Sequence, residues 1–335
     1  MKNHLYWIDF AKTIGLLLMI LGHGNMVNDE FRCYIYSFHM PLFFIISGLL
    51  TRTPNGEGKI ITSIQKNFRA LMIPYFCMNL FCLLFFSFVE YFKGELGFYV
   101  LKSHIWAILL GVGYNINSIR PVCTAMCFFY ALFIVKLLYN VLPKNRLSKV
   151  IQVAICFVIV KILTSYHIDT YVPLDSAIMA YPFFIAGTEI KHFFSREIKN
   201  KLILFFVILL ILLATYFISS YNGRCDIDTM RYGKFYSLFL CTGICTSFAI
   251  LAVCSCLNMQ LVGIKVFLKN ICNGAPLIVG LNLLAINAFK TGLLHIVKQW
   301  SSIYGIALGI VIILAFYPII IFTKKRFPIL IGFRK

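Results

Sequence analysis

The first apolar stretch of the chain carries an acid, an amine and an imidazole, three groups that are costly to bury. It reads WIDFAKTIGLLLMILGHG, and its ionisable residues are Asp9, Lys12 and His23. A charged side chain at the centre of a membrane helix costs about 2.5 to 3.5 kcal/mol on insertion scales. Their presence together therefore marks this stretch as a candidate reaction site.

The spacing of the three residues places them on one face of a helix. Lys12 and His23 fall within about 20° of the same direction, and Asp9 lies one turn before Lys12. His23 would then lie about 16 Å beyond the acid–amine pair along the helix. Each residue also has a simpler explanation, because Asp9 suits a helix start, Lys12 can snorkel to the headgroups and His23 can mark a helix end.

A second apolar stretch, YIYSFHMPLFFIISGLL, adds His39 near the same expected side of the membrane. Two histidines on adjacent helices can converge on one site. Imidazole is the side chain best suited to move a proton near neutral pH. The second histidine therefore weakens the simpler explanation of His23.

The elements that must position these residues are membrane helices. Of the 335 residues, 60% are apolar and 13% charged, which is more apolar than soluble domains. Because about 20 apolar residues of helix cross the hydrocarbon layer, we expect an all-α polytopic membrane bundle in a single domain, residues 1–335. About ten spans are predicted, at 11–27, 34–50, 71–91, 122–142, 150–166, 177–192, 202–219, 235–257, 275–294 and 303–322.

The formal net charge of +19 could also suit a nucleic-acid-binding protein, so the placement of the basic residues has to decide. They gather in alternate loops, which is the positive-inside pattern of a membrane protein with both termini in the cytoplasm. The stretch 98–113 is apolar but too short to span, and we expect it to be interfacial or re-entrant. The longest polar breaks are 51–68, inside, and 222–234, outside.

Most of the twelve cysteines lie in apolar segments, where small packing residues are the simplest interpretation. Cys33 and Cys225 are expected on the outer side, where they could pair. No small-residue cleavage site follows the first segment, which is therefore expected to be retained as a helix rather than removed as a signal.

The order LGHG followed by YIYSFHMPLFFIISGLL resembles the signature opening of the acyltransferase family 3 membrane proteins, which O-acylate polysaccharides and related acceptors. A basic residue, normally arginine, separated by ten residues from the helix-one histidine is usual in that family. Lys12 resembles that residue here, although lysine lacks the planar fork of arginine.

Weaker similarities continue along the chain. The Lys66-Asn67-Phe68-Arg69 segment with Pro74-Tyr75 resembles the family's third-helix opening, and MCFFYALF resembles an aromatic segment in which Cys127 replaces a tryptophan. YPFFIAG and KKRFPILIG also fit. The segment 228–233 resembles the branch of fucose 4-O-acetylase-like and enterobacterial-common-antigen acetyltransferase-like proteins. That branch often has a histidine where Asn282 or Asn287 falls here.

The resemblance implies a bacterial inner-membrane O-acyltransferase that uses acetyl-CoA to acylate a cell-surface or lipid-linked sugar. Acyl transfer to a hydroxyl needs a base and an aligned thioester, and neither requires a metal or a permanently bound cofactor. We expect His23 to be the base or a transient acyl carrier, His39 to assist it, and Asp9 to shape the donor end. Cofactor-binding candidates for the coenzyme A phosphates are Lys12, Lys66 and Arg69. Ordinary positive-inside topology explains the last two equally well.

Arg120, Asp228, Arg231 and Tyr232 are candidates for the acceptor mouth, although solvated loop residues are the commoner explanation. Two rival functions remain open at this point. A transporter or flippase of lipid-linked sugars usually shows matched halves with broken helices, and the Asp9, Lys12 and His23 pattern is not repeated later in the chain. A membrane scaffold would use the in-helix charges only to hold helices together.

Overall fold

The chain folds as an all-helical polytopic membrane protein, as predicted. The computed structural model describes residues 5–51, 57–95, 97–116, 118–168, 170–194, 200–257, 261–294 and 301–332. Within these ranges, 8 helices are long and apolar enough to cross a membrane. The number of spans and the orientation of the termini stay predictions.

Two compact units divide the chain, and each is described by itself. The first comprises Met1–Thr51, Pro182–Asp226 and Arg231–Phe322, and the second comprises Arg52–Tyr181, Ile227–Met230 and Thr323–Lys335. The expectation of one membrane domain stays a prediction.

The first unit is built mainly from six helices and a small hairpin. Their bounds are α1 Tyr6–His23, α2 Asp29–Leu50, α9 Lys201–Asn222, α10 Tyr236–Cys256, α11 Val262–Asn273, α12 Ala275–Leu294, β1 Cys225–Asp226 and β2 Arg231–Tyr232. It also holds most of α13 Ser302–Arg326, the end of α8 Leu174–Glu189 and the 3-10 turn η3 Ile190–His192.

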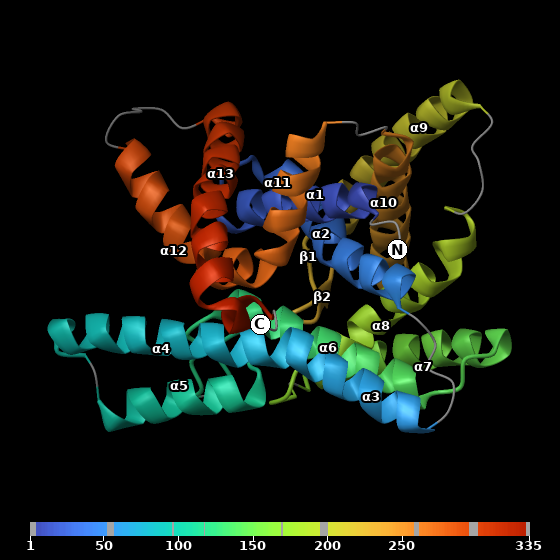
Figure 1. Ribbon diagram of the computed structural model, residues 1–335. Coiled ribbons are helices and arrows are strands. Elements are labelled where there is room, and N and C mark those ends of the chain that lie inside the picture. Colours follow the sequence, from blue (N-terminus) through green and yellow to red (C-terminus); the bar gives the residue numbers. More distant parts are fainter. Residues whose placement is uncertain are drawn as a thin grey trace. The chain divides into compact units, whose positions relative to one another are not determined.

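The second unit holds the middle of the chain. Its elements are α3 Glu57–Asn67, the π-turn η1 Phe68–Met72, α4 Ile73–Lys93, α5 Phe98–Leu110, η2 Thr124–Met126, α6 Cys127–Val141, α7 Arg146–Ser165, the start of α8 and η4 Pro328–Ile331. Figure 1 shows α5 beside α4, and the hydroxyl of Tyr75 on α4 donates to the carbonyl oxygen of Ile108 at 2.8 Å. The stretch 98–113 contains this short apolar helix, and its interfacial or re-entrant placement stays a prediction.

All ten predicted segments contain a helix, but their ends differ from the prediction. α1 begins at Tyr6 rather than residue 11, which puts Asp9 in its first turn. α8 has 16 residues and is therefore shorter than the eight candidate spans. The polar break at 51–68 contains a helix, α3, and the break at 222–234 contains the β1–β2 hairpin.

α2 begins where a side-chain cap and two acids favour a helix start. The Asn28 side chain accepts from the backbone N–H of Phe31 at 3.1 Å, and Asp29 and Glu30 occupy the first turn. Both features satisfy or complement the unpaired N–H groups of a helix N-terminus. α2 is therefore anchored from its first residue, about three turns before His39.

Two glycines let α2 and the end of α8 meet backbone to backbone. A Cβ atom at Gly48 would lie 2.1 Å from the carbonyl oxygen of Phe184, and one at Gly187 would lie 2.1 Å from that of Ile45. No larger residue fits at either place without moving a helix. Small residues that permit such close crossings are typical of membrane helix packing.

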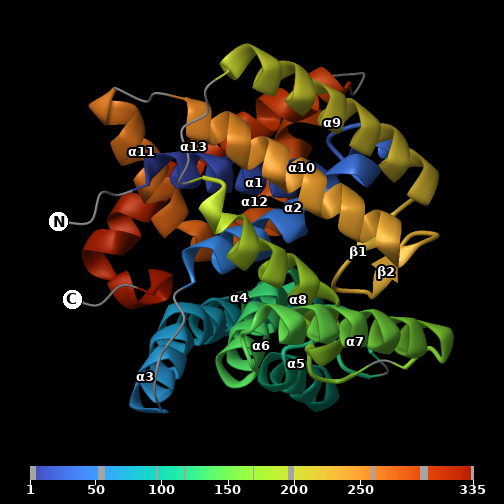
Figure 2. The same ribbon diagram turned by 90° about the vertical axis from the view of Figure 1, so that its right-hand side faces the viewer.

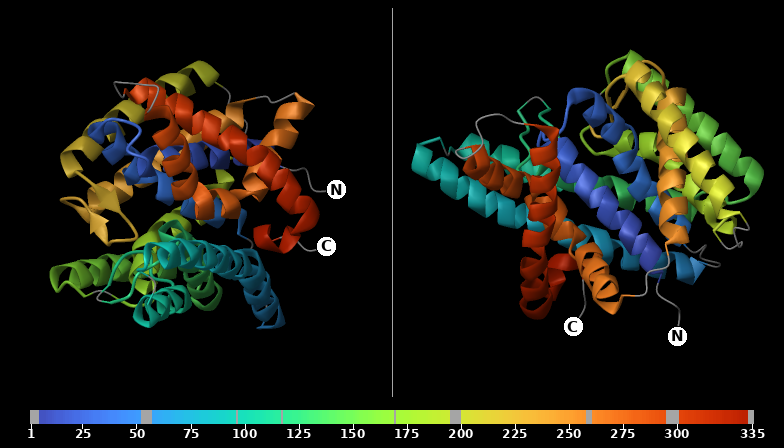
Figure 3. Two further views of the ribbon diagram at one scale, coloured as in Figure 1. Left: turned by 90° about the vertical axis from the view of Figure 1, so that its left-hand side faces the viewer. Right: turned by 90° about the horizontal axis from the view of Figure 1, so that it is seen from above.

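Large apolar side chains remain exposed on the outer surface of the first unit. α9 runs beside α10 in Figures 1 and 2, and again in the view from above in Figure 3. Leu210 and Phe217 of α9 are 66% and 63% exposed. A water-soluble domain does not present such an apolar helix face, whereas a lipid-facing helix does.

Candidate active site

His23 and His39 face each other within the first unit. His23 is the last residue of α1 and His39 lies in the middle of α2, and their ring centroids are 6.3 Å apart with the ring planes at 89°. His39 is buried, whereas His23 is partly exposed. The structure therefore brings together the two histidines that the sequence singled out.

The protonation of the His39 ring is set by a backbone oxygen. Its Nδ1 lies 2.9 Å from the carbonyl oxygen of Ile35. A carbonyl oxygen can only accept, so Nδ1 carries the hydrogen. In the neutral ring, Nε2 then keeps its lone pair.

The His23 ring is held in the same tautomer by Asn282 of α12. The Nδ1 of His23 lies 3.3 Å from the Oδ1 of Asn282, and the Nδ2 of Asn282 donates to the carbonyl oxygen of Val279 at 2.6 Å. Because the amide nitrogen is used on Val279, the amide oxygen faces the imidazole and accepts from Nδ1–H. The Nε2 of His23 is therefore left as the basic nitrogen.

Asn282 is a site residue whose role the sequence did not predict. Its side chain is fully buried, and it contacts His23 across 259 residues of sequence. Two features of the sequence could have pointed to it. Asn282 is a polar residue within an apolar segment, and it falls where the branch that the chain resembles often has a histidine.

Tyr36 is a second residue that the sequence did not single out. Its ring centroid is 5.0 Å from that of His39 and 6.2 Å from that of His23. A Cβ atom at Gly22 would lie 3.1 Å from the Tyr36 ring, so this glycine makes room for it. Tyr36 therefore packs against both imidazoles.

Asp9 and Lys12 lie near the other end of α1. Asp9 is buried and Lys12 is partly exposed. The backbone oxygen of Asp9 accepts from the Thr13 hydroxyl at 2.9 Å and from the Cys272 thiol of α11 at 3.1 Å. Burial raises the pKa of the Cys272 thiol to about 12, and this thiol is therefore a hydrogen-bond donor rather than a nucleophile.

Lys66 and Arg69 belong to the second unit. Lys66 lies in the last turn of α3 and Arg69 in the π-turn η1, and both are exposed. A π-turn within a long helix is often found at functional sites.

The four acceptor candidates fall into two groups. Arg231 and Tyr232 form β2 in the first unit, whereas Arg120 and Asp228 belong to the second unit. The carboxylate of Asp228 accepts from the Cys127 thiol at 2.9 Å, and a Cβ atom at Gly113 would lie 2.4 Å from it. Neither unit by itself brings all four residues together.

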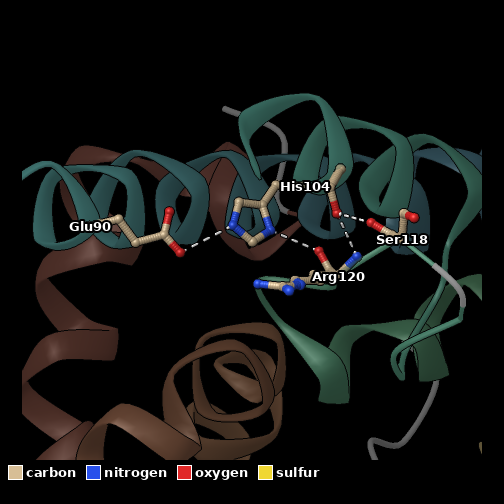
Figure 4. A network of polar contacts seen from close by, with 5 residues as sticks. Glu90, His104, Ser118 and Arg120 are labelled. Atoms are coloured by element: carbon tan, nitrogen blue, oxygen red, sulfur yellow. Dashed lines mark hydrogen bonds and ion pairs between the residues drawn. The ribbon is translucent and has the colours of Figure 1, made fainter. Parts of the chain in front are cut away.

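Arg120 is held by a polar network that the sequence did not predict. His104 lies between two acceptors (Figure 4), with Nδ1 2.8 Å from the carbonyl oxygen of Arg120 and Nε2 3.3 Å from Glu90 Oε1. The Ser103 hydroxyl accepts from Arg120 N–H at 2.8 Å and donates to the carbonyl oxygen of Ser118 at 2.6 Å. Both contacts of His104 are hydrogen bonds only if the His104–Glu90 pair holds one extra proton.

Metal-ligating side chains do not cluster in the described part of the chain, where no three His, Cys, Asp or Glu residues could hold an ion together.

The fold and the site define a multi-pass membrane protein with a facing pair of histidines between its first two helices. Residues 5–323 match the family described as Acyltransferase domain, and the chain belongs to this family, acyltransferase family 3. The protein is accordingly a membrane O-acyltransferase. No curated protein and no solved structure matches the chain.

Proposed function

We propose that the protein transfers an acetyl group from acetyl-CoA to a hydroxyl of a cell-surface or lipid-linked sugar, with His23 as the general base. The observation that carries this proposal is the histidine pair, in which both Nδ1 atoms are committed to oxygen acceptors. Both Nε2 atoms are thereby left to handle protons. We assign His23 as the base because it ends α1 and is partly exposed as a residue, whereas His39 is buried within α2 and assists it.

The reaction needs one proton to move twice. As the sugar oxygen attacks the acetyl carbonyl carbon, Nε2 of His23 takes the hydroxyl proton. The new C–O bond forms, the thioester C–S bond breaks, and His23 returns the proton to the departing coenzyme A thiolate. Asn282 stabilises the transient imidazolium by keeping its oxygen on Nδ1–H.

Donor binding is assigned to the basic residues on the expected cytoplasmic side. Coenzyme A is a polyanion, and Lys12, Lys66 and Arg69 would pair with its phosphates. Asp9 would shape the donor end of the site. The exposure of Lys66 and Arg69 supports a contact with a soluble cosubstrate.

On the acceptor side, we assign Arg120, Asp228, Arg231 and Tyr232 to sugar recognition. The resemblance of the segment 228–233 supports the fucose 4-O-acetylase-like and enterobacterial-common-antigen acetyltransferase-like branch. This assignment is consistent with a protein in the bacterial inner membrane whose sugar acceptor enters the site from the outer side of that membrane.

Labelled acetyl-CoA and extracted surface glycan test the proposal in membranes that contain the protein. We expect label in an alkali-labile ester with wild type and with the control His167→Asn, and none with His23→Gln. His167 is exposed with a φ of 51°, a conformation that asparagine tolerates. Full activity of His23→Gln would refute the assignment of the base, and absence of any ester with wild type would favour the flippase or scaffold alternatives.

A further inference from the structure

Arg224 stands beside the histidine pair although nothing in the catalytic proposal uses it. It follows Gly223 in the link between α9 and β1, and its side chain is exposed. Its guanidinium carbon lies 5.4 Å from the centroid of the Tyr36 ring. Tyr36 in turn packs against His39 and His23. A single aromatic ring therefore separates the guanidinium from the two imidazoles.

The link that carries Arg224 is held in place by the buried side chain of Asn222. Its Nδ2 donates to the carbonyl oxygen of Tyr232 at 2.8 Å, and its Oδ1 accepts from Phe235 N–H at 2.8 Å. The Asn222 backbone oxygen accepts from Lys234 N–H at 2.8 Å. β1, which follows directly, packs on α2. The position of Arg224 over α2 is thus built into the hairpin.

The other charged groups near Tyr36 differ from Arg224 in their contacts. Arg32 pairs with Asp29 at 2.8 Å and contacts Asn25, so its guanidinium is already engaged, and Asp226 is a further charged residue near Tyr36. Toward the described residues, Arg224 lies over the Tyr36 ring but donates no hydrogen bond and forms no ion pair. Its five N–H donors therefore stay available to a ligand.

A guanidinium is a planar fork of N–H donors. This geometry matches the two oxygens of a carboxylate or a phosphate. Because the Tyr36 ring below Arg224 also packs against both histidines, an oxyanion bound at Arg224 would be carried on the same sugar as the reacting hydroxyl or on its neighbour.

We propose that Arg224 is an acceptor-binding residue that takes a carboxylate or phosphate group, so that the acceptor is an anionic saccharide. This inference rests on the proposed function, because it assigns the substrate class of the same site. A neutral glycan would leave the fork unpaired and would be a poorer acceptor.

The acyl-transfer assay tests this with three preparations of the surface glycan: untreated, carboxyl-reduced, and dephosphorylated with hydrofluoric acid. With wild type, we expect one of the two treatments to lower ester labelling roughly tenfold or more, the scale of a lost charged hydrogen bond. Loss after carboxyl reduction identifies a uronic acid, and loss after dephosphorylation identifies a phosphate.

Variants of Arg224 complete the test. Arg224→Gln should lower labelling of untreated glycan to the level that wild type shows with the neutralised glycan, and Arg224→Lys should fall between them. The matched control is Lys234→Gln, which removes a cation stacked 4.2 Å from the Tyr221 ring of the same unit. Equal labelling of all three glycans by wild type, or wild-type labelling by Arg224→Gln, would overturn the inference while leaving the proposed function intact.

Anion binding at Arg224 can also be measured without acyl transfer. Arginines are modified with phenylglyoxal and mapped by mass spectrometry in wild type and His23→Ala, in the presence of sodium phosphate, methyl glucuronide or the neutral methyl glucoside. Protection of Arg224 by one of the two anions but not by the glucoside, with exposed Arg146 modified throughout, supports the oxyanion site. Absence of protection overturns it, whatever the acyl-transfer assay shows.

Discussion

Asn282 and His23 form a hydrogen bond of 3.3 Å between two helices that are far apart in sequence, and this bond leaves Nε2 of His23 as the nitrogen with a lone pair. The arrangement has the form of a catalytic histidine and its orienting partner, with an amide in place of a carboxylate.

Removing the Asn282 side chain should slow the chemical step. We expect Asn282→Ala to lower kcat about tenfold to a hundredfold, the usual cost of losing an orienting partner, with the KM for acetyl-CoA unchanged. The control is Asn287→Ala, since Asn287 lies on the same helix but is exposed. Steady-state kinetics of both variants give kcat and the KM for acetyl-CoA. A change in KM alone would contradict an orienting role for Asn282.

At Tyr36, the ring should matter more than the hydroxyl, because the described contacts with both histidines are made by the ring. Tyr36→Phe is expected to keep kcat within about threefold of wild type, whereas Tyr36→Leu should lose tenfold or more. Tyr99→Leu serves as control, because Tyr99 is among the most exposed aromatic side chains. Equal loss in the Phe and Leu variants would point instead to the hydroxyl.

Lys66 and Arg69 are proposed to bind the phosphates of the donor. Removing their charges should therefore raise the KM only for a donor that carries phosphates. The double change Lys66→Gln with Arg69→Gln is expected to raise the KM for acetyl-CoA about tenfold or more and to leave that for acetyl-pantetheine unaltered. Arg146→Gln, at another exposed basic position, controls for general charge. A similar change in KM for both donors would mean that Lys66 and Arg69 only set the membrane topology and do not bind the donor phosphates.

The crossing of α2 with the end of α8 should not tolerate a methyl group. Gly48→Ala and Gly187→Ala each place Cβ 2.1 Å from a backbone oxygen, so we expect a loss of about 1 to 3 kcal/mol or more in unfolding free energy. Gly263→Ala, with nothing within 4 Å of its Cβ, should be neutral or stabilising. Thermal unfolding in detergent compares the three, and equal midpoints would contradict the close crossing.

Cys225 should give the protein a measurable sensitivity to alkaline pH. Burial raises the pKa of its thiol from about 9 to about 12. Above pH 9 the unfolded chain ionises this thiol and the folded chain does not, so folding loses about 1.4 kcal/mol per pH unit up to pH 12. Below pH 9 the effect vanishes. Unfolding of wild type and Cys225→Ala at pH 7.5, 9 and 10 measures the difference, and parallel pH dependences would contradict it.

The helices could be predicted from the sequence because a bilayer imposes a length and a composition on each of them. α3 and α11 were not predicted, since both mix lysines with apolar residues and lack the continuous hydropathy of a span. The bounds of α1 were predicted less well than its existence. Its start at Tyr6 lies among aromatic and polar residues that hydropathy does not count as helix.

The histidine pair could be predicted because His23 and His39 lie on adjacent segments joined by a short loop. Asn282, Tyr36 and Arg224 could not, because their roles arise from tertiary contacts. His23 meets Asn282 only when α1 packs on α12, and Arg224 meets Tyr36 only when the hairpin packs on α2.

The choice of an amide at position 282 has a consequence for the charge of the site. A carboxylate there would add a negative charge beside the imidazole and would itself take up a proton in acid. An amide carries no charge and does not titrate, so the acceptor of the His23 Nδ1–H keeps one state whatever the pH.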